Sequence, residues 1–316
     1  MKGTTAPPVA GLSAERRNRH PPRTLPFFTV DVFTEERFGG NPLAVVMMND
    51  ELDTAMMQTV AAEFNLSETT FVLPSSDPVN TARIRIFNRT AEMAFAGHPL
   101  VGTAFTLATQ RPDLTAAIFE TAAGLVDVAI ERDPNGAPIA AVIVPPQPLQ
   151  VGEPVPPDVI AKALRLHPED VLTTNHAPVA TSTGTSYVIA ELADDALSRC
   201  DPDLAMFREA RDADPRLGGR FSVHVYSKRG RSIRARMFAP LAGTWEDPAT
   251  GSANAALACL LLSLEPGATE DSFIVHQGVE MGRPSVLHVD ARRTPDGIVA
   301  TLRGSCVPVM RGELTV

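Results

Sequence analysis

The 316-residue sequence contains few cysteines and few aromatic residues, and it has no long apolar run. Its three cysteines, Cys200, Cys259 and Cys306, are too few and too scattered for a disulfide framework or a zinc site. This usage fits the reducing environment of the cytoplasm. No stretch reaches the roughly 18 consecutive apolar residues that a transmembrane helix needs. The sequence therefore predicts a cytoplasmic protein that neither crosses nor binds a membrane.

Familiar cofactor and catalytic motifs are also missing. The chain has no G-x-x-x-x-G-K-[ST] phosphate loop, no H-E-x-x-H zinc motif, no C-x-x-C pair and no complete G-x-S-x-G turn. These absences argue against a nucleotide-binding enzyme, a zinc enzyme and an α/β-hydrolase. We therefore expect no metal site and no organic cofactor.

The charge of the chain narrows the choice of partner. A net charge of −9 is a poor match for nucleic acid or an anionic membrane surface, so we expect a small molecule. Residues 1–24 are rich in proline, arginine and small polar residues and lack the apolar core of a signal peptide. They predict a disordered tail.

The clearest pattern in the sequence is an internal repeat. The segment HPLVGTA (His98–Ala104) has the same Pro, Gly and Ala spacing as DPATGSA (Asp247–Ala253), 149 residues further along the chain. An alternating, strand-like run precedes each segment, RIRIF and RARMF. Because the offset is about one domain length, the repeat predicts two related halves.

A proline-rich stretch, residues 144–158, marks the expected junction, since proline stiffens and extends a linker. We place the two domains at residues 25–147 and 148–316, and we allow the last strand to return to the first domain.

Strand patterns dominate both halves. Asn135-Gly136 between two apolar runs predicts a β-hairpin. One amphipathic helix is predicted by a core-facing stripe at i, i+4 steps, formed by Leu52, Met56, Val60 and Phe64. Each half also contains one apolar, small-residue helix that must be buried. This order predicts an α+β fold with mainly antiparallel sheets around a central helix.

The starts of these two buried helices raise a question of hydrogen bonding. Their first N–H groups have no partner within the helix. A protein group can satisfy them, as Asp247 would if it capped the second helix, or a ligand anion can. The residues alone leave both possibilities open.

Four polar residues lie in segments that should be buried, where carboxylates are rare unless paired or functional. They are Glu68 in NLSETTFV, His98 in FAGHPL, and Asp247 and Ser252 in EDPATGSA. Histidines outside these segments, His224 among them, receive no role.

Five ordered motifs carry a family resemblance: FGGNPLAVV, NLSETTFV, FAGHPLVGTA, EDPATGSA and QGVEMGRPS, between Phe38 and Ser285. Together they resemble the PhzF-like phenazine-biosynthesis isomerases of the diaminopimelate epimerase-like superfamily. The resemblance implies two pseudosymmetric domains, each an antiparallel barrel-like sheet around a central helix, with the site in the cleft between them. It also implies a homodimer.

The resemblance assigns roles to the candidate residues. Glu68 would move the proton, and a carboxyl screened from water can have the raised pKa that this task needs. His98 and Asp247 would complete the catalytic set by binding and orienting the substrate. Ser252, with N–H groups near Gly97, His98 and Gly251, would hold a substrate carboxylate.

These roles imply a cofactor-independent isomerase that moves a proton within a small carboxylate, similar to trans-2,3-dihydro-3-hydroxyanthranilate isomerase. An amino- or hydroxy-acid epimerase or racemase remains open, although neither repeat segment holds the cysteine of a two-thiol mechanism. A noncatalytic small-acid binding protein is the third possibility. Arg89 could recognise a second acidic group. Trp245 adjoins EDPATGSA and either walls the cleft or packs in the core. Arg283 is expected to be solvated in a turn.

Overall fold

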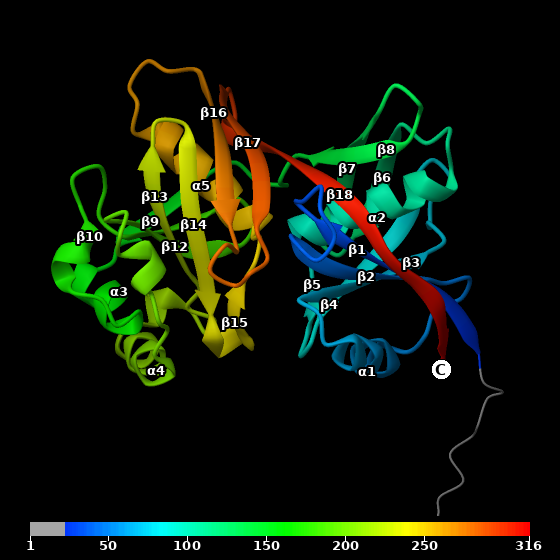
Figure 1. Cartoon of the computed structure of the whole chain (residues 1–316), viewed down its shortest axis with the longest axis horizontal. Coiled ribbons are helices and arrows are strands. Elements are labelled where there is room, and N and C mark those ends of the chain that lie inside the picture. Colours follow the sequence, from blue (N-terminus) through cyan, green and yellow to red (C-terminus); the bar gives the residue numbers. More distant parts are fainter. Residues whose placement is uncertain (1–22) are drawn as a thin grey trace, which may run out of the picture.

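The computed structural model describes residues 23–316 and shows two lobes that lie side by side (Figure 1). Most of the expected tail, residues 1–24, lies outside the described residues, and Thr24 already belongs to the first strand. No helix in the described part is long and apolar enough to cross a membrane.

The first lobe is formed by residues 24–143, and the second lobe follows it along the chain. In the first lobe the elements are β1 (Thr24–Val32), β2 (Asn41–Met47), α1 (Thr54–Phe64), β3 (Glu68–Leu73), β4 (Ala82–Asn88), β5 (Glu92–Met93), α2 (Gly97–Gln110), β6 (Ala116–Thr121), β7 (Gly124–Arg132) and β8 (Pro138–Ile143). In the second lobe they are β9 (Gln150–Pro154), α3 (Pro157–Ala163), β10 (Val171–Leu172), β11 (Val179–Ser182), β12 (Ser186–Leu192), α4 (Leu204–Ala213), β13 (Val223–Arg229), β14 (Ser232–Ala239), β15 (Thr244–Asp247), α5 (Gly251–Ser263), β16 (Glu270–Gln277) and β17 (Ser285–Thr294). The last strand, β18 (Gly297–Thr315), passes from the second lobe to the first (Figure 1).

The order of strand pairs repeats between the lobes. In the first lobe β2–β3 is parallel, β3–β4 antiparallel, β4–β6 parallel and β6–β7 antiparallel. In the second lobe β12–β13, β13–β14, β14–β16 and β16–β17 follow the same alternation. This repetition confirms the pseudosymmetric α+β fold.

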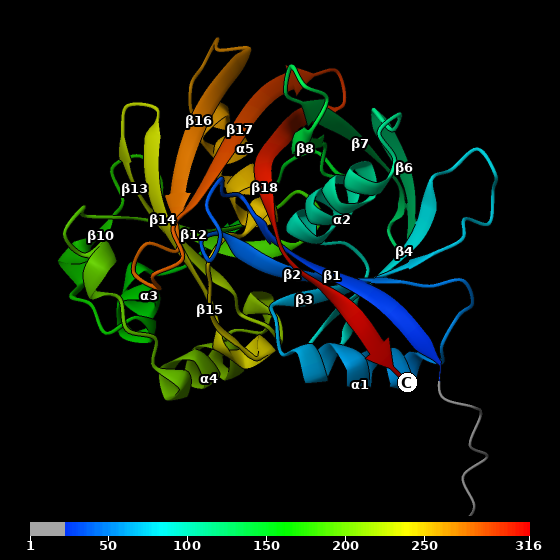
Figure 2. The ribbon, with the colours of Figure 1, turned by 45° about the vertical axis from the view of Figure 1, so that its right-hand side comes forward.

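The last strand closes the first lobe. Residues 306–315 of β18 pair with β1, residues 302–305 pair with β8, and residues 297–303 pair with β17 of the second lobe. The strands β18, β1, β2, β3, β4, β6, β7 and β8 therefore form a closed barrel. Since β18 belongs to both sheets, it holds the two lobes together (Figure 2).

Each lobe wraps its sheet around one buried helix. Helix α2 is buried from Gly97 to Ala108, and α5 from Gly251 to Leu262. Small residues let the strands approach closely: a Cβ on Gly102 would lie 2.7 Å from the side chains of Leu43 and Val32. A larger residue there would displace the barrel wall.

We expected the proline-rich stretch 144–158 to be a linker. It also contains β9, which pairs with β11 of the second lobe. The proposed domain boundary at 147/148 falls between β8 and β9 and stays a prediction.

Two smaller expectations have different outcomes. The hairpin at Asn135-Gly136 is confirmed: Gly136 has φ +84° and its N–H donates to the Asp133 carbonyl at 2.9 Å. The stripe on α1 is wrong by one residue, since Met57 is fully buried and Met56 is 38% exposed. Met57 lies on the same face of the helix as Val60 and Ala61, at i+3 and i+4. Counting in steps of four alone does not show whether Met56 or Met57 faces the core.

Candidate functional site

A small enclosed cavity of about 40 Å³ lies between the lobes, and we call it the cleft cavity. It is formed where β3, β12 and β15 meet the starts of α2 and α5. All six sequence-predicted site residues line it, namely Glu68, Gly97, His98, Asp247, Gly251 and Ser252. The structure therefore brings together residues that lie up to 184 positions apart in the chain.

Glu68 is the first residue of β3, and its side chain is only 15% exposed. Burial, followed by the negative charge of Asp247, raises the pKa of the Glu68 carboxyl above its ordinary value, while the charges of Arg220 and Arg89 oppose the rise. A carboxyl in this state exchanges its proton near neutral pH, as a group that both takes and returns protons must.

His98 is the second residue of α2, and its Nε2 lies 3.3 Å from Glu68 Oε2. Burial lowers the pKa of His98 to about 3, so the ring is neutral at physiological pH. Its Nδ1 lies 3.3 Å from Asn41 Nδ2, and an amide nitrogen only donates. This contact favours the tautomer that keeps the ring proton on Nε2, which faces Glu68 but forms no hydrogen bond with it in the structure.

Asp247 ends β15 and accepts two hydrogen bonds from protein groups. Its Oδ1 accepts from Asn41 Nδ2 at 2.9 Å, and its Oδ2 accepts from Thr250 Oγ1 at 2.6 Å. Burial raises the pKa of the Asp247 carboxyl, and these hydrogen bonds oppose the rise. Two carboxyl groups with raised pKa values thus lie in one cavity.

The expectation that Asp247 caps α5 is wrong. Helix α5 begins at Gly251 with Thr250 as its N-cap, and no side chain caps it. Thr250 N–H donates instead to Gln277 Oε1 at 3.2 Å. The start of α2 likewise has no side-chain cap, since its N-cap residue is Ala96.

The offset of the sequence repeat also needs a correction. Gly97 begins α2 and Gly251 begins α5, so the equivalent of His98 in the second lobe is Ser252 rather than Asp247. The sequence motifs align His98 with Asp247 because both precede a proline. That proline lies inside α2 in the first lobe but before α5 in the second.

The two helix starts face each other across the cleft cavity. A Cβ on Gly97 would lie 3.8 Å from the Ser252 backbone nitrogen. Ser252 Oγ lies 2.7 Å from Tyr187 Oη of β12, which fixes the hydroxyl at the mouth of α5. Uncapped N–H groups from two helices, together with this hydroxyl, form an environment suited to a carboxylate.

Sequence reasoning missed a buried amide network behind Asp247. Gln277 Nε2 donates to the Asp247 carbonyl at 2.8 Å, and Gln277 Oε1 accepts from Asn254 Nδ2 at 2.8 Å. Asn254 Oδ1 in turn lies 3.0 Å from Nε2 of His224, a fully buried residue to which we assigned no role from the sequence. Gln277 and Asn41 do lie in quoted motifs, and this was the available signal.

The structure also places the three other residues singled out in the sequence, Arg283, Arg89 and Trp245. Arg283 is not solvated as expected, because it donates to Asp31 Oδ1 at 2.6 Å and to the Gly39 carbonyl at 2.7 Å. Arg89 Nη2 donates across the cleft to the Gly243 carbonyl at 2.5 Å. Trp245 is 51% exposed and does not line the cleft cavity.

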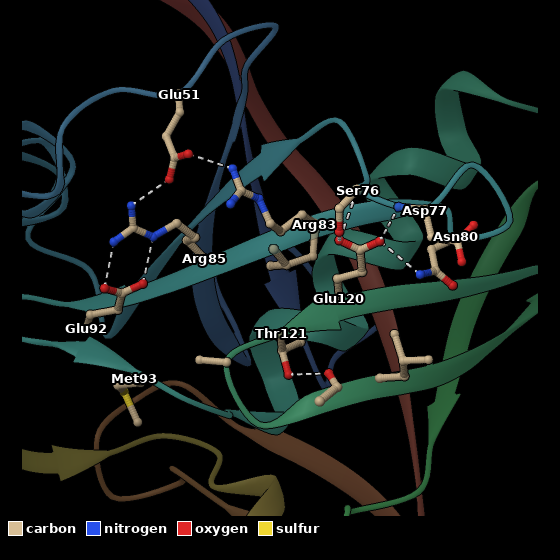
Figure 3. Close-up of a pocket in the computed structure, with 14 residues that line it drawn as sticks. Glu51, Ser76, Asp77, Asn80, Arg83, Arg85, Glu92, Met93, Glu120 and Thr121 are labelled. Carbon is tan, nitrogen blue, oxygen red and sulfur yellow. Dashed lines mark hydrogen bonds and ion pairs between the residues drawn. The ribbon is translucent and has the colours of Figure 1, made fainter.

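A larger pocket, of about 570 Å³, lies at the edge of the first lobe, and we call it the β4–β6 pocket. Figure 3 shows that its charged side chains point toward one another: Arg85 pairs with Glu51 and Glu92, and Arg83 pairs with Glu51. Glu120 accepts hydrogen bonds from Asn80 and Ser76, which lower its pKa to about 2. Its polar groups already have partners, so it is the weaker candidate despite its size.

No group of three or more His, Cys, Asp or Glu side chains within residues 23–316 is arranged to hold a metal ion.

Comparisons with known proteins agree on one family. The family model described as phenazine biosynthesis-like protein matches residues 30–312. An uncharacterized isomerase of Mesorhizobium japonicum is 38% identical, over 93% of this chain and all of the relative. The trans-2,3-dihydro-3-hydroxyanthranilate isomerase of Pseudomonas aeruginosa is 35% identical, over 87% of this chain and 93% of that enzyme.

Solved structures give the same result. The PhzF-family phenazine biosynthesis protein of Bacillus anthracis superposes with a TM-score of 0.81 at 26% identity, covering 93% of this chain and 100% of that one. A hydroxyproline epimerase of Agrobacterium vitis shares the fold, with a TM-score of 0.60 at 14% identity over 93% of this chain and 91% of that one.

Proposed function

The chain belongs to the phenazine biosynthesis-like protein family and is an isomerase, and we propose that it moves a proton within a small carboxylate without a cofactor. The observation that carries this proposal is the placement of Glu68. Its carboxyl lies in an enclosed cavity, next to a neutral histidine and to a second carboxyl with a raised pKa. The proposed reaction resembles that of trans-2,3-dihydro-3-hydroxyanthranilate isomerase, a name that three relatives carry at 33–35% identity.

In the proposed reaction Glu68 begins as a carboxylate and removes a proton from a carbon of the substrate. The C–H bond breaks, its electron pair moves into the adjacent unsaturated system, and a double bond shifts. The resulting Glu68 carboxylic acid then returns the proton to another carbon. One group suffices for both transfers because its raised pKa makes both proton states accessible near neutral pH.

The substrate carboxylate would bind between the starts of α2 and α5. Backbone N–H groups near Gly97 and Gly251 and the Ser252 hydroxyl would donate to it, which agrees with the absence of side-chain caps at both helices. His98 Nε2–H would donate toward Glu68 or toward charge developing on the substrate. Asp247, held by Asn41 and Thr250, would orient a polar group of the substrate.

A direct test is proton NMR in D₂O with trans-2,3-dihydro-3-hydroxyanthranilate and a panel of small unsaturated acids. We expect a shifted double bond and at most one solvent deuterium per turnover, because Glu68 returns the substrate's own proton unless that proton first exchanges with the solvent. Formation of the opposite stereoisomer, with deuterium at the stereocentre, would favour an epimerase or racemase. Tight binding of acids without exchange by the intact protein would favour a noncatalytic small-acid binding protein.

Two expectations from the sequence join this proposal. We propose that the protein is a homodimer and that it acts in the cytoplasm. Light scattering across micromolar concentrations would contradict the first if it gave a monomer mass, and fractionation of the native host would test the second.

A further inference from the structure

A second chamber adjoins the cleft cavity on its outer side. This outer pocket has a volume of about 460 Å³. It shares five lining residues with the cleft cavity, and these define the boundary between the two: Asn88, Met93, Phe95, Thr185 and Arg220. The cleft cavity, at about 40 Å³, has room for little more than a water molecule. A substrate that reaches Glu68 therefore either extends into the outer pocket or passes through it.

Arg220 lies at this boundary, on a short segment that is loosely packed before the arginine and tightly packed after it. Gly218, with φ +68°, and Gly219 precede it, and no atom lies within 4 Å of a Cβ built on either glycine. Phe221, directly after it, is 1% exposed and packs on Phe207 with ring centroids 5.0 Å apart. Phe221 also has a positive φ of 32°, which a non-glycine residue adopts only when its surroundings enforce it. The segment is thus anchored beside the arginine on one side and free on the other.

Arg220 carries a charge without a protein partner. Among residues 23–316, no carboxylate or carbonyl forms an ion pair or hydrogen bond with its guanidinium, whereas Arg89 donates to Gly243 and Arg85 pairs with Glu92. Of the described residues that line the outer pocket it is the cationic one, and the acidic one, Glu92, is already paired. Its charge reaches the cavity, since it opposes the rise in pKa that burial causes at both Glu68 and Tyr187.

We propose that Arg220 determines specificity by binding a second anionic group of the substrate in the outer pocket, while the first carboxylate occupies the helix starts. A planar guanidinium with free donors binds a carboxylate by two parallel hydrogen bonds. The reacting carbon would lie between the two anchors, beside Glu68. The substrate class is thus small dianionic acids. This inference rests on the proposed function, because it assumes that the first carboxylate binds at Ser252.

The test compares acids of equal chain length by isothermal titration calorimetry at pH 8, where both carboxyl groups of a diacid are ionised. The probes are succinate against butyrate and glutarate against valerate. The variants are Arg220→Gln and Arg220→Lys, with Arg208→Gln on α4 as the matched control, since Arg208 is also exposed but lines neither cavity.

We expect the wild type to bind each diacid about tenfold or more tightly than its monoacid partner, the effect of one added charge-assisted contact. Arg220→Gln should remove this preference and leave monoacid affinity within about twofold, Arg220→Lys should retain part of it, and Arg208→Gln should keep all of it. An unchanged preference in Arg220→Gln, or no preference in the wild type, overturns the inference.

Failure of the proposed function gives a different result. If Ser252→Ala leaves the affinity for both monoacids unchanged, the helix-start site is wrong, whatever Arg220 does. If Ser252→Ala weakens both acid classes but Arg220→Gln preserves the diacid preference, the proposed function stands and only the inference about Arg220 fails.

Discussion

The cleft cavity and the β4–β6 pocket are both lined with carboxylates, yet they shift the pKa values of these groups in opposite directions. In the β4–β6 pocket Glu120 is half-buried and its pKa is lowered by hydrogen bonds, first from Asn80. In the cleft cavity Glu68 is enclosed and its pKa is raised, first by burial. The larger pocket has satisfied its polar groups, whereas the smaller one keeps a carboxyl in a state that favours proton uptake. The volume of a pocket is therefore a poor guide to the functional site, and a buried carboxyl with a shifted pKa is a better one.

The largest difference between the two regions should appear in turnover. Glu68→Gln keeps the shape of the side chain but removes its proton chemistry, so kcat should fall by about 10²–10⁴-fold with little change in ligand affinity. Glu120→Gln, the matched change in the β4–β6 pocket, should leave kcat unchanged. Steady-state kinetics on a substrate found by the NMR screen checks both. Equal kcat values for the two variants would remove Glu68 from the mechanism.

The second largest difference between the two regions should appear in the free energy of unfolding. Gln277→Ala leaves Thr250 N–H, Asn254 Nδ2 and the Asp247 carbonyl without their partner in a buried network, so the free energy of unfolding should fall by about 3 kcal/mol or more. Asn80→Ala breaks one part-buried bond to Glu120 and should cost about 1 kcal/mol or less. Urea denaturation measures both, and similar losses would contradict the view that the cleft network is the more tightly buried.

The pH dependence of turnover should come third. If Glu68 starts as a base, kcat/KM falls as the pH drops through the pKa of Glu68, which lies above its ordinary value. The charge of Asp247 contributes to that rise, so Asp247→Asn should move this acidic limb to lower pH, whatever it does to the maximum rate. Glu120→Gln should not move it. A limb that stays in place in Asp247→Asn would show that the two cleft carboxyls are not coupled.

The smallest effect concerns the helix-start site. Tyr187→Phe removes the partner of Ser252 Oγ but leaves the hydroxyl itself, so carboxylate affinity should weaken by about two- to tenfold. Thr121→Val removes a comparable bond to the Gly124 carbonyl in the β4–β6 pocket and should not affect affinity. Calorimetry with butyrate compares the two variants. Equal affinities would show that Tyr187 does not contribute to carboxylate binding.

The sequence predicted the two halves and the central helices because repeats and buried small-residue helices are local patterns. The family resemblance supplied the roles of the six residues that meet in the cleft cavity. It did not predict which helix residues are equivalent. Both motifs contain a proline at the same spacing, and only the structure shows that Pro99 lies inside α2 whereas Pro248 precedes α5. A helix start depends on backbone hydrogen bonds that spacing does not encode.

The supporting residues were harder to predict for another reason. Asn41 reaches Asp247 across 206 positions and Tyr187 reaches Ser252 across 65, and a polar residue in a strand has the same local pattern whether or not it makes such a bond. Arg220 follows two glycines, as many surface turn residues do. Only the cavity beside it distinguishes it from a solvated arginine.

The central claim is that the cleft cavity holds a carboxyl poised to carry a proton, and the most direct measurement is the titration of Glu68 beside that of Glu120. Carbon NMR of a protein with ¹³C-labelled glutamate carboxyls, assigned with Glu68→Gln and Glu120→Gln, reports both midpoints in one sample. We predict that Glu68 titrates above the ordinary value of 4.5 and that Glu120 titrates below it. A Glu68 midpoint at or below 4.5 would contradict the account.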